Sequence, residues 1–135
     1  MQPYKTKAKK LAGTNYRELR NNALILYVGI KKRTKRRPYI RSAYWQKEKI
    51  FFDYFWDHLF QKAPKERFQR LKYFAASIEL IEKSRNKPVS KLNPNKSEEM
   101  LHRFAGLTHE GDLFFTQIKE DKKRRKYFMS CFTPE

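Results

Sequence analysis

Residues 101–132 read LHRFAGLTHEGDLFFTQIKEDKKRRKYFMSCF, and three runs within them alternate between apolar and polar side chains. The runs are Leu101–Leu107, Leu113–Glu120 and Arg125–Phe132. They are rich in Phe, Tyr, Thr and Ile, which favour the half-buried surface of a β-sheet. Gly111 falls in the first connection, where a hairpin turn favours a residue that adopts positive φ. We therefore predict an antiparallel meander of three strands.

The charges beside the second connection suggest a register for this meander. If Glu120 pairs with Lys126, opposite charges flank the loop, and Ile118 then lies opposite Phe128. The same register predicts the further pairs Thr116–Ser130 and Phe114–Phe132. One face is then mostly apolar and suited to packing on helices. The opposite face carries Phe115, Gln117, Lys119, Tyr127, Met129 and Cys131, and could either bind a polar, flat ligand or be a solvated face.

Upstream of the meander, the apolar spacing predicts two long helices. Ser42 is a potential cap for a helix over residues 43–62, which has apolar side chains nearly all round and should be buried. A second helix is predicted from Pro64 to about Asn86, followed by a linker over residues 88–95. Residues 43–86 would thus form a helical pair. The predicted fold class is α+β, with two long helices packed on a C-terminal antiparallel sheet of three or more strands.

The first fifty residues are strongly basic. They hold 15 Lys and Arg against two Glu, and so carry +13 of the net charge of +18. We predict a flexible basic arm over residues 1–13 and a basic helix or strand region over residues 14–42. Such a basic segment on a more balanced body is typical of proteins that bind nucleic acid. The most concentrated cations, which would contact phosphates, are Lys31, Lys32, Arg33, Lys35, Arg36 and Arg37.

Several other classes of protein fit the sequence poorly. A chain of 135 residues predicts a single domain with its own core. Cys131 is the one cysteine, so neither an internal disulfide nor a cysteine-based zinc site is expected. Asp53 and Asp57 would share a helix face, but two carboxylates alone are a weak signal for a metal ion. With no signal peptide and no apolar run of about twenty residues, we predict a cytoplasmic protein without membrane contact or cofactor.

The meander contains the residue types that RNA cleavage without a metal requires. Attack of a ribose 2′-OH on the adjacent phosphate needs a proton acceptor, a proton donor for the leaving 5′ oxygen, and nearby cations. His102 and His109 could serve as acid or base, and Arg103 and Lys119 could stabilise the phosphate charge. A basic sheet that only binds RNA would contain a similar set of residues.

A pattern in the same block resembles a family of nucleases. It runs Arg103-Phe104-x-Gly106-x-Thr108-x-x-Gly111-x-x-Phe114-x-x-Gln117-Ile118-Lys119-Glu120 and continues as Lys126-Tyr127-Phe128-Met129-Ser130-x-Phe132. This resembles the terminal block of small proteins from phages and other mobile elements, which are grouped with the barnase–EndoU–colicin–RelE (BECR) fold. The resemblance covers about residues 101–134, a quarter of the chain.

The resemblance implies one or more helices before a small antiparallel sheet, with a metal-independent ribonuclease site on that sheet. Carried over by position, it implies the site residues Arg103, Lys119, Lys126, Tyr127 and Ser130. In the predicted register, Ser130 and Lys119 face opposite sides of the sheet. They share a site only if the register is shifted by one residue or a bulge intervenes; otherwise Ser130 is structural.

Together these observations predict an RNA-binding, metal-independent endoribonuclease of BECR type, with RNA favoured over DNA. It would be a toxin from a mobile element, with an immunity or antitoxin protein as partner. In this hypothesis Tyr127 stacks on the substrate or donates a hydrogen bond, while Lys126 joins the basic segment in binding nucleic acid. The alternative is a non-catalytic nucleic-acid-binding protein, such as a small regulator or inhibitor. A structural RNA partner of the ribosomal-protein kind is a third.

Overall fold

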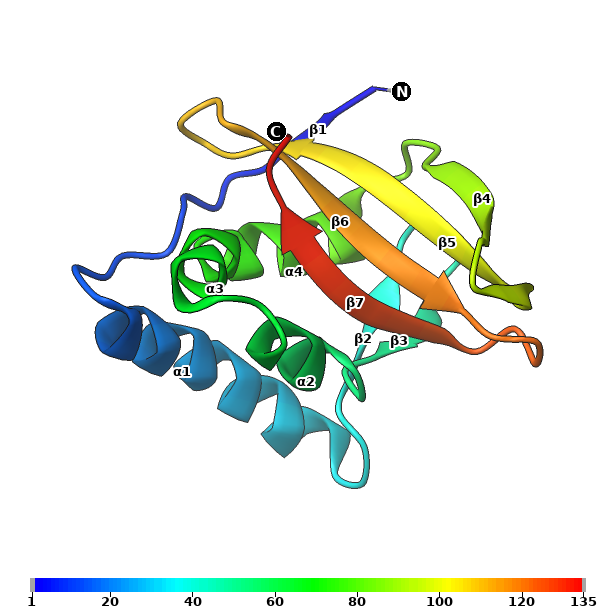
Figure 1. Cartoon of the computed structure of the whole chain (residues 1–135), viewed down its shortest axis with the longest axis horizontal. Coiled ribbons are helices and arrows are strands. Elements are labelled where there is room, and N and C mark those ends of the chain that lie inside the picture. Colours follow the sequence, from blue (N-terminus) through cyan, green and yellow to red (C-terminus); the bar gives the residue numbers. More distant parts are fainter. Residues whose placement is uncertain (1, 135) are drawn as a thin grey trace.

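Residues 2–134, which the computed structural model describes, contain four helices and seven strands. The helices lie together on one side of the three longest strands (Figure 1). Their bounds are α1 (Tyr16–Thr34), α2 (Phe55–Phe60), α3 (Pro64–Leu71) and α4 (Phe74–Lys83). The strands are β1 (Tyr4–Lys5), β2 (Tyr39–Ser42), β3 (Glu48–Phe51), β4 (Val89–Asn93), β5 (Lys96–Leu107), β6 (Leu113–Glu120) and β7 (Lys126–Phe132).

All seven strands belong to one curled, mixed sheet. Six of them follow the order β1-β5-β6-β7-β3-β2, and the seventh, β4, also pairs with β5. β5 is long enough to pair with two strands along the same edge. β4 lies antiparallel to its first part, and β1 lies parallel to its end, where Tyr4 is opposite Gly106. β3 is parallel to β7, with Ile50 opposite Lys126.

The predicted meander is confirmed as β5, β6 and β7, and its first strand begins earlier, at Lys96. The pairs Glu120–Lys126 and Ile118–Phe128 are also confirmed. Beyond them a β-bulge at Met129 shifts the register by one residue. The predicted pairs Thr116–Ser130 and Phe114–Phe132 are therefore wrong.

The bulge decides which side chains of β7 share a face of the sheet. Gln117 lies opposite Ser130, so Ser130 shares a face with Lys119, and Cys131 turns to the other face. We call the helix-covered side the inner face; it carries Phe104, Phe114, Thr116, Ile118, Phe128 and Cys131. The outer face carries Arg103, Phe115, Gln117, Lys119, Tyr127, Ser130 and Phe132.

The predicted arrangement of two long helices on a small antiparallel sheet is wrong. Residues 43–62 do not form a helix; they form the turn after β2, then β3, then the six-residue α2. The run looked apolar all round because Ile50 is buried in the sheet while Phe55 is buried in a helix. The predicted second helix is divided at Lys72 and Tyr73 into α3 and α4. The predicted linker over residues 88–95 contains β4.

The basic N-terminal region is more ordered than its composition predicts. In the segment predicted to be a flexible arm, Tyr4 and Lys5 form β1, and Thr6 is buried. The backbone N–H groups of Lys7 and Ala8 donate to the Glu79 carboxylate on α4, which fixes this segment to the helical layer. Residues 14–42 contain both a helix, α1, and a strand, β2.

The core lies between the helices and the inner face. Phe55 of α2 stacks on Phe128 of β7, with ring centroids 4.5 Å apart, and Phe74 of α4 packs against both. A side chain at Gly106 would place its Cβ 2.5 Å from the Phe114 ring, so only glycine fits there. No helix among residues 2–134 is long and apolar enough to cross a membrane.

Candidate functional site

The inner face carries a polar cluster at the end of the sheet next to the β6–β7 loop, where β6 ends at Glu120 and β7 begins at Lys126. We call it the His102 cluster; it consists of Glu48, Ser90, His102, Glu120 and Lys126. Its members come from β3, β4, β5, β6 and β7, so it depends on the long-range pairing of the sheet.

His102 is held through both of its ring nitrogens. Nε2 lies 2.8 Å from Glu120 Oε1, and Nδ1 lies 2.6 Å from Ser90 Oγ. Because a carboxylate can only accept, Nε2 carries a proton and donates it to Glu120. In the neutral ring, Nδ1 then accepts from the Ser90 hydroxyl. The hydrogen bond to Glu120 thus fixes the tautomer in which Nδ1 is the acceptor.

Lys126 supplies the positive charge of the cluster. Its Nζ forms an ion pair with Glu48 and lies 3.8 Å from Glu120 Oε1. Trp45, in the turn between β2 and β3, packs on both His102 and Lys126: its ring centroid is 4.9 Å from that of His102 and 5.0 Å from Lys126 Nζ. Lys126 is only 5% exposed, so the predicted contact between this lysine and nucleic acid would require the cluster to open.

The residues of the His102 cluster differ in their exposure to solvent. His102 is 8% exposed, but Ser90 on β4 and Glu48 on β3 are both solvent-exposed. The hydroxyl group that contacts Nδ1 therefore belongs to an exposed residue on the neighbouring strand. A ligand hydroxyl that displaced the Ser90 side chain could reach Nδ1 without disturbing Glu120.

On the outer face, aromatic rings and a lysine lie in one register row across four strands. The row, which we call the outer row, runs from Tyr39 on β2 through Phe51 and Tyr127 to Lys119 on β6. Cations lie on its rings: Lys49 Nζ is 4.6 Å from the Tyr39 centroid, and the Arg37 guanidinium is 4.0 Å from that of Phe51. Tyr39 and Phe51 remain partly exposed. Rings and cations on an open sheet face are typical of surfaces that bind single-stranded nucleic acid.

Lys119 and Tyr127, predicted as catalytic, are neighbours in this row but are largely covered. Tyr54 packs edge-on against Tyr127 at 4.8 Å, and Lys119 Nζ lies 4.4 Å from the Tyr54 centroid. Lys119 also forms an ion pair with Glu99 at 3.2 Å. The Tyr127 hydroxyl donates to Asp121 at 3.3 Å, and the residue is 3% exposed. These contacts favour a structural or positioning role for the pair.

The other predicted catalytic residues are distributed over the sheet. Arg103 and Ser130 lie in one row, joined through Gln117, on the same face as Lys119. Arg103 packs over the ring of Phe132 at 4.9 Å, while Ser130 is buried.

The two candidate histidines cannot act at one site. His109 is exposed in the β5–β6 turn, so β5 separates it from His102 by roughly 15 Å or more. The bulge adds Ser130 to the face that carries Arg103, Lys119 and Tyr127, while His102 and Lys126 lie on the other.

The basic segment predicted to bind phosphates spans the end of α1 and the loop after it. Lys31, Lys32 and Arg33 lie in the last turn of α1, where cations also stabilise the helix dipole. Five of the six cations are exposed. The sixth, Arg37, makes a two-pronged contact with Asp53, and these hydrogen bonds raise its pKa above the usual value.

Sequence reasoning missed several members of the site. Ser90 lies in a segment that was predicted to be a linker, and Glu48 and Trp45 lie in one predicted to be a helix. The available signal was the charge pair Glu120–Lys126, which correctly placed two members side by side. Among residues 2–134, no group of three or more His, Cys, Asp or Glu side chains could hold a metal ion.

The chain was also compared with family models, with curated proteins and with solved structures, and none of them matched.

Proposed function

We propose that the protein binds RNA and cleaves it as a metal-independent endoribonuclease of BECR type, with His102 and Glu120 at the catalytic centre. The observation that carries this proposal is the geometry of His102. Its Nε2 is bound to a carboxylate, and its Nδ1 is bound to the hydroxyl of Ser90, an exposed residue. A histidine oriented in this way is suited to general acid–base catalysis.

In the proposed reaction the substrate 2′-OH takes the place of the Ser90 hydroxyl at Nδ1. His102 accepts the 2′-OH proton, and O2′ forms a bond to the adjacent phosphorus. Glu120 stabilises the resulting imidazolium. The imidazolium then gives its proton to the 5′ oxygen as the P–O5′ bond breaks, which leaves a 2′,3′-cyclic phosphate and a free 5′-OH. Lys126, which becomes accessible only when the cluster opens, offsets negative charge near the phosphate.

The surface of the molecule supports an RNA substrate. The loop between β6 and β7 carries the exposed cations Lys122, Lys123, Arg124 and Arg125 at the same end of the sheet as the His102 cluster. Together with the outer row and the basic end of α1, it offers contacts for a sugar–phosphate backbone and for unstacked bases.

Cleavage of a labelled single-stranded RNA in the presence of EDTA tests the proposal. The wild-type protein should cut the RNA, whereas a 2′-O-methyl RNA of the same sequence should stay intact because its 2′ oxygen cannot attack. His102→Asn should abolish cleavage. His109→Asn, which changes the exposed histidine of the β5–β6 turn, is the matched control and should retain it. If the folded wild-type protein leaves the RNA uncut, the enzymatic proposal is refuted.

A second candidate function is non-catalytic nucleic-acid binding. It is favoured by a specific observation: His102, Glu120 and Lys126 are already paired with one another or with neighbours, as in a buried structural network. In that case the wild-type protein and His102→Asn would both bind RNA and leave it intact. His102→Asn would lower the free energy of unfolding instead.

The predicted role as a toxin leads to a further proposal about expression. If cleavage of cellular RNA is harmful, His102→Asn should be expressed at a higher level than the wild-type protein in the absence of an immunity or antitoxin partner. His109→Asn should behave like the wild type. Equal yields of all three proteins would argue against a toxic activity.

A further inference from the structure

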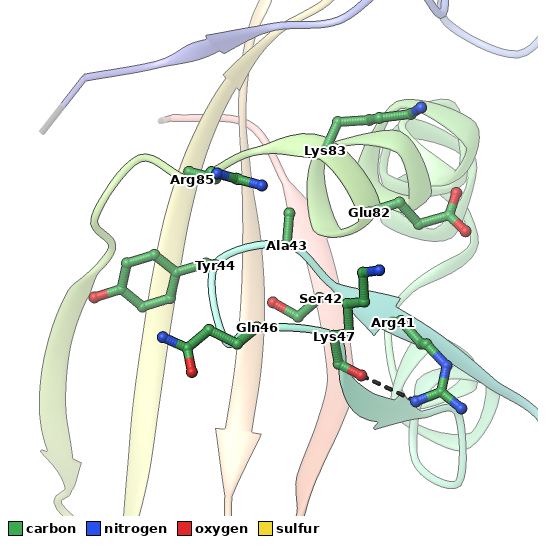
Figure 2. Close-up of a pocket in the computed structure, with 9 residues that line it drawn as sticks. All are labelled: Arg41, Ser42, Ala43, Tyr44, Gln46, Lys47, Glu82, Lys83 and Arg85. Carbon is green, nitrogen blue, oxygen red and sulfur yellow. Dashed lines mark hydrogen bonds between the residues drawn. The ribbon is translucent and has the colours of Figure 1, made fainter.

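A pocket of about 920 Å³ lies between the turn that joins β2 to β3 and the carboxyl end of α4 (Figure 2). The turn contributes Tyr44, Gln46 and Lys47, and α4 with the residues after it contributes Glu82, Lys83 and Arg85. The volume is within the range of pockets that hold small organic ligands, and it would accept a nucleotide.

The walls of this pocket are fixed by hydrogen bonds. The Ala43 N–H donates to the Ile81 carbonyl at 3.0 Å, which ties the turn to α4. The Ser42 hydroxyl accepts from the Trp45 N–H at 3.1 Å, and the Arg41 guanidinium donates to the Lys47 carbonyl at 3.0 Å (dashed in Figure 2).

The turn also has an uncommon backbone conformation. Gln46 and Lys47 have φ values of 54° and 70°, although neither is glycine. Conformations of this kind often occur at functional sites, where the surrounding structure maintains them.

The net positive charge of the residues that line the pocket favours an anionic ligand. Arg41, Lys47, Lys83 and Arg85 contribute four positive charges, and Glu82 is the only carboxylate in the lining. All five residues are solvent-exposed, and Arg41 is also held by its hydrogen bond to the Lys47 carbonyl. Figure 2 shows the Tyr44 ring pointing away from α4, which carries Glu82 and Lys83. The pocket therefore combines phosphate-binding groups with an aromatic ring.

The same turn connects the pocket to the His102 cluster. Trp45 follows Tyr44 in the chain, and its ring packs on His102 and Lys126. Tyr44 packs on Trp45 and on Phe104 of β5, with centroid distances of 5.3 and 5.6 Å. One turn thus lines the pocket on one side and the candidate catalytic centre on the other.

We propose that this pocket binds a nucleotide of the RNA strand next to the bond that is cleaved. Arg85 and Lys47 contact its phosphate, and its base lies against Tyr44. The inference rests on the proposed function, because it assumes an RNA substrate. It adds a specificity site that determines how the strand enters the catalytic centre.

The test measures binding of a 2′-O-methyl oligonucleotide, which cannot be cleaved, by fluorescence anisotropy. Arg85→Glu should raise the dissociation constant about tenfold or more, since it replaces a phosphate contact with a repulsion. Lys87→Glu is the matched control, because it makes the same type of charge reversal two residues further on, outside this pocket. It should change the dissociation constant no more than about threefold. Thermal melting checks that both variants fold.

Competition experiments show whether the pocket recognises an RNA strand, a free mononucleotide or inorganic phosphate. Adenosine 5′-monophosphate and inorganic phosphate should compete weakly with the oligonucleotide, and their competition should depend on Arg85. In the cleavage assay, Arg85→Glu should raise KM and leave kcat within a few-fold of the wild type. Equal weakening by Arg85→Glu and Lys87→Glu would overturn the inference, and so would Arg85-dependent binding of the mononucleotide without binding of the oligonucleotide.

These results also separate the inference from the proposed function. If Arg85→Glu selectively weakens oligonucleotide binding while the wild-type protein leaves RNA uncut, the catalytic proposal fails and the pocket remains an RNA site. If RNA is cut and Arg85→Glu behaves like its control, the pocket inference fails and the enzyme remains.

Discussion

Adjacent residues of β6 and β7 serve two different surfaces. Glu120 and Lys126 point to the inner face and belong to the His102 cluster, whereas their neighbours Lys119 and Tyr127 point to the outer face and belong to the outer row. The inner cluster is held by short, mutual hydrogen bonds, and its His102 and Lys126 are buried. At its β2–β3 end, the outer row instead offers partly exposed rings with cations on them.

This difference separates two tasks. Proton transfer needs groups whose orientation is fixed, and the inner cluster provides that orientation. Binding of a flexible strand needs accessible rings and charges, which the outer row provides. The two tasks can therefore be altered independently by mutation, even at consecutive positions in the chain.

The sharpest test uses two neighbours on β6. Glu120→Gln keeps the shape of the side chain and removes the charge that stabilises the His102 imidazolium, so kcat should fall by roughly 10²-fold or more. Lys119→Met, one residue earlier, should leave kcat within a few-fold of the wild type. The measurement is steady-state cleavage of a labelled RNA. A larger loss of kcat in Lys119→Met than in Glu120→Gln would reverse the assignment of the two faces.

The importance of pairing within the cluster can be measured by stability. Lys126→Met removes a buried cation that pairs with Glu48 and lies near Glu120, and should destabilise the protein by about 1–2 kcal/mol. Lys123→Met, in the exposed β6–β7 loop, should stay within about 0.5 kcal/mol of the wild type. Urea denaturation provides the comparison. A neutral effect of Lys126→Met would show that the cluster is not held together by this lysine.

Changes in the outer row should affect binding more than stability. Tyr39→Ala removes a partly exposed ring between Arg41 and Lys49 and should weaken oligonucleotide binding by about 1–2 kcal/mol, which is roughly 5- to 30-fold. Phe60→Ala is the control, because this exposed ring lies on α2 and packs under Arg67. Equal dissociation constants for the two variants would remove the outer row from the RNA-binding surface.

A smaller effect is expected at His58, a half-buried histidine outside both surfaces. Burial lowers its pKa, and the charges of Lys62 and Arg70 add to the shift, whereas Glu66 opposes it. The unfolded chain, with a histidine pKa of about 6.5, then binds more protons than the folded protein as the pH falls below that value. Stability should therefore decrease from pH 7 to pH 5.5, and less so in His58→Gln. Identical pH profiles of the melting temperature would contradict this.

Cys131 gives a prediction about reactivity. It lies on the inner face, and burial raises the pKa of its thiol to about 12. The thiol should thus stay protonated and react very slowly with iodoacetamide at pH 8, and react readily once the protein is unfolded in urea. Rapid labelling of the folded protein would show that this face of β7 opens.

The sequence identified the meander because alternating side chains reflect local strand geometry, and the pair Glu120–Lys126 because opposite charges flank a short loop. It could not reveal the bulge at Met129, since one extra residue inside an apolar run leaves no mark in the pattern. The helix predicted over residues 43–62 failed because a strand followed by a short helix can be as apolar as one buried helix. The parallel pairing of β3 with β7 joins segments far apart in the chain, so no local pattern predicted it.

The same limits apply to the candidate site. His102 and Glu120 could be named from their chemistry, and Lys126 from its pairing. Their neighbours Ser90, Glu48 and Trp45 come from segments whose structure was predicted wrongly, so their contacts depended on the tertiary fold. Lys119 and His102 lie on opposite faces because Lys119 pairs with Leu101, the neighbour of His102 on β5, and successive side chains of a strand alternate in direction.

The most direct test of the account is to identify the ends of RNA treated with wild-type protein and with His102→Asn, both in EDTA. We expect the wild-type protein to produce 2′,3′-cyclic phosphate and 5′-hydroxyl ends, and His102→Asn, although folded and able to bind RNA, to produce none. Cleavage by His102→Asn at the wild-type rate, or 3′-hydroxyl ends from the wild-type protein, would contradict a catalytic centre at His102.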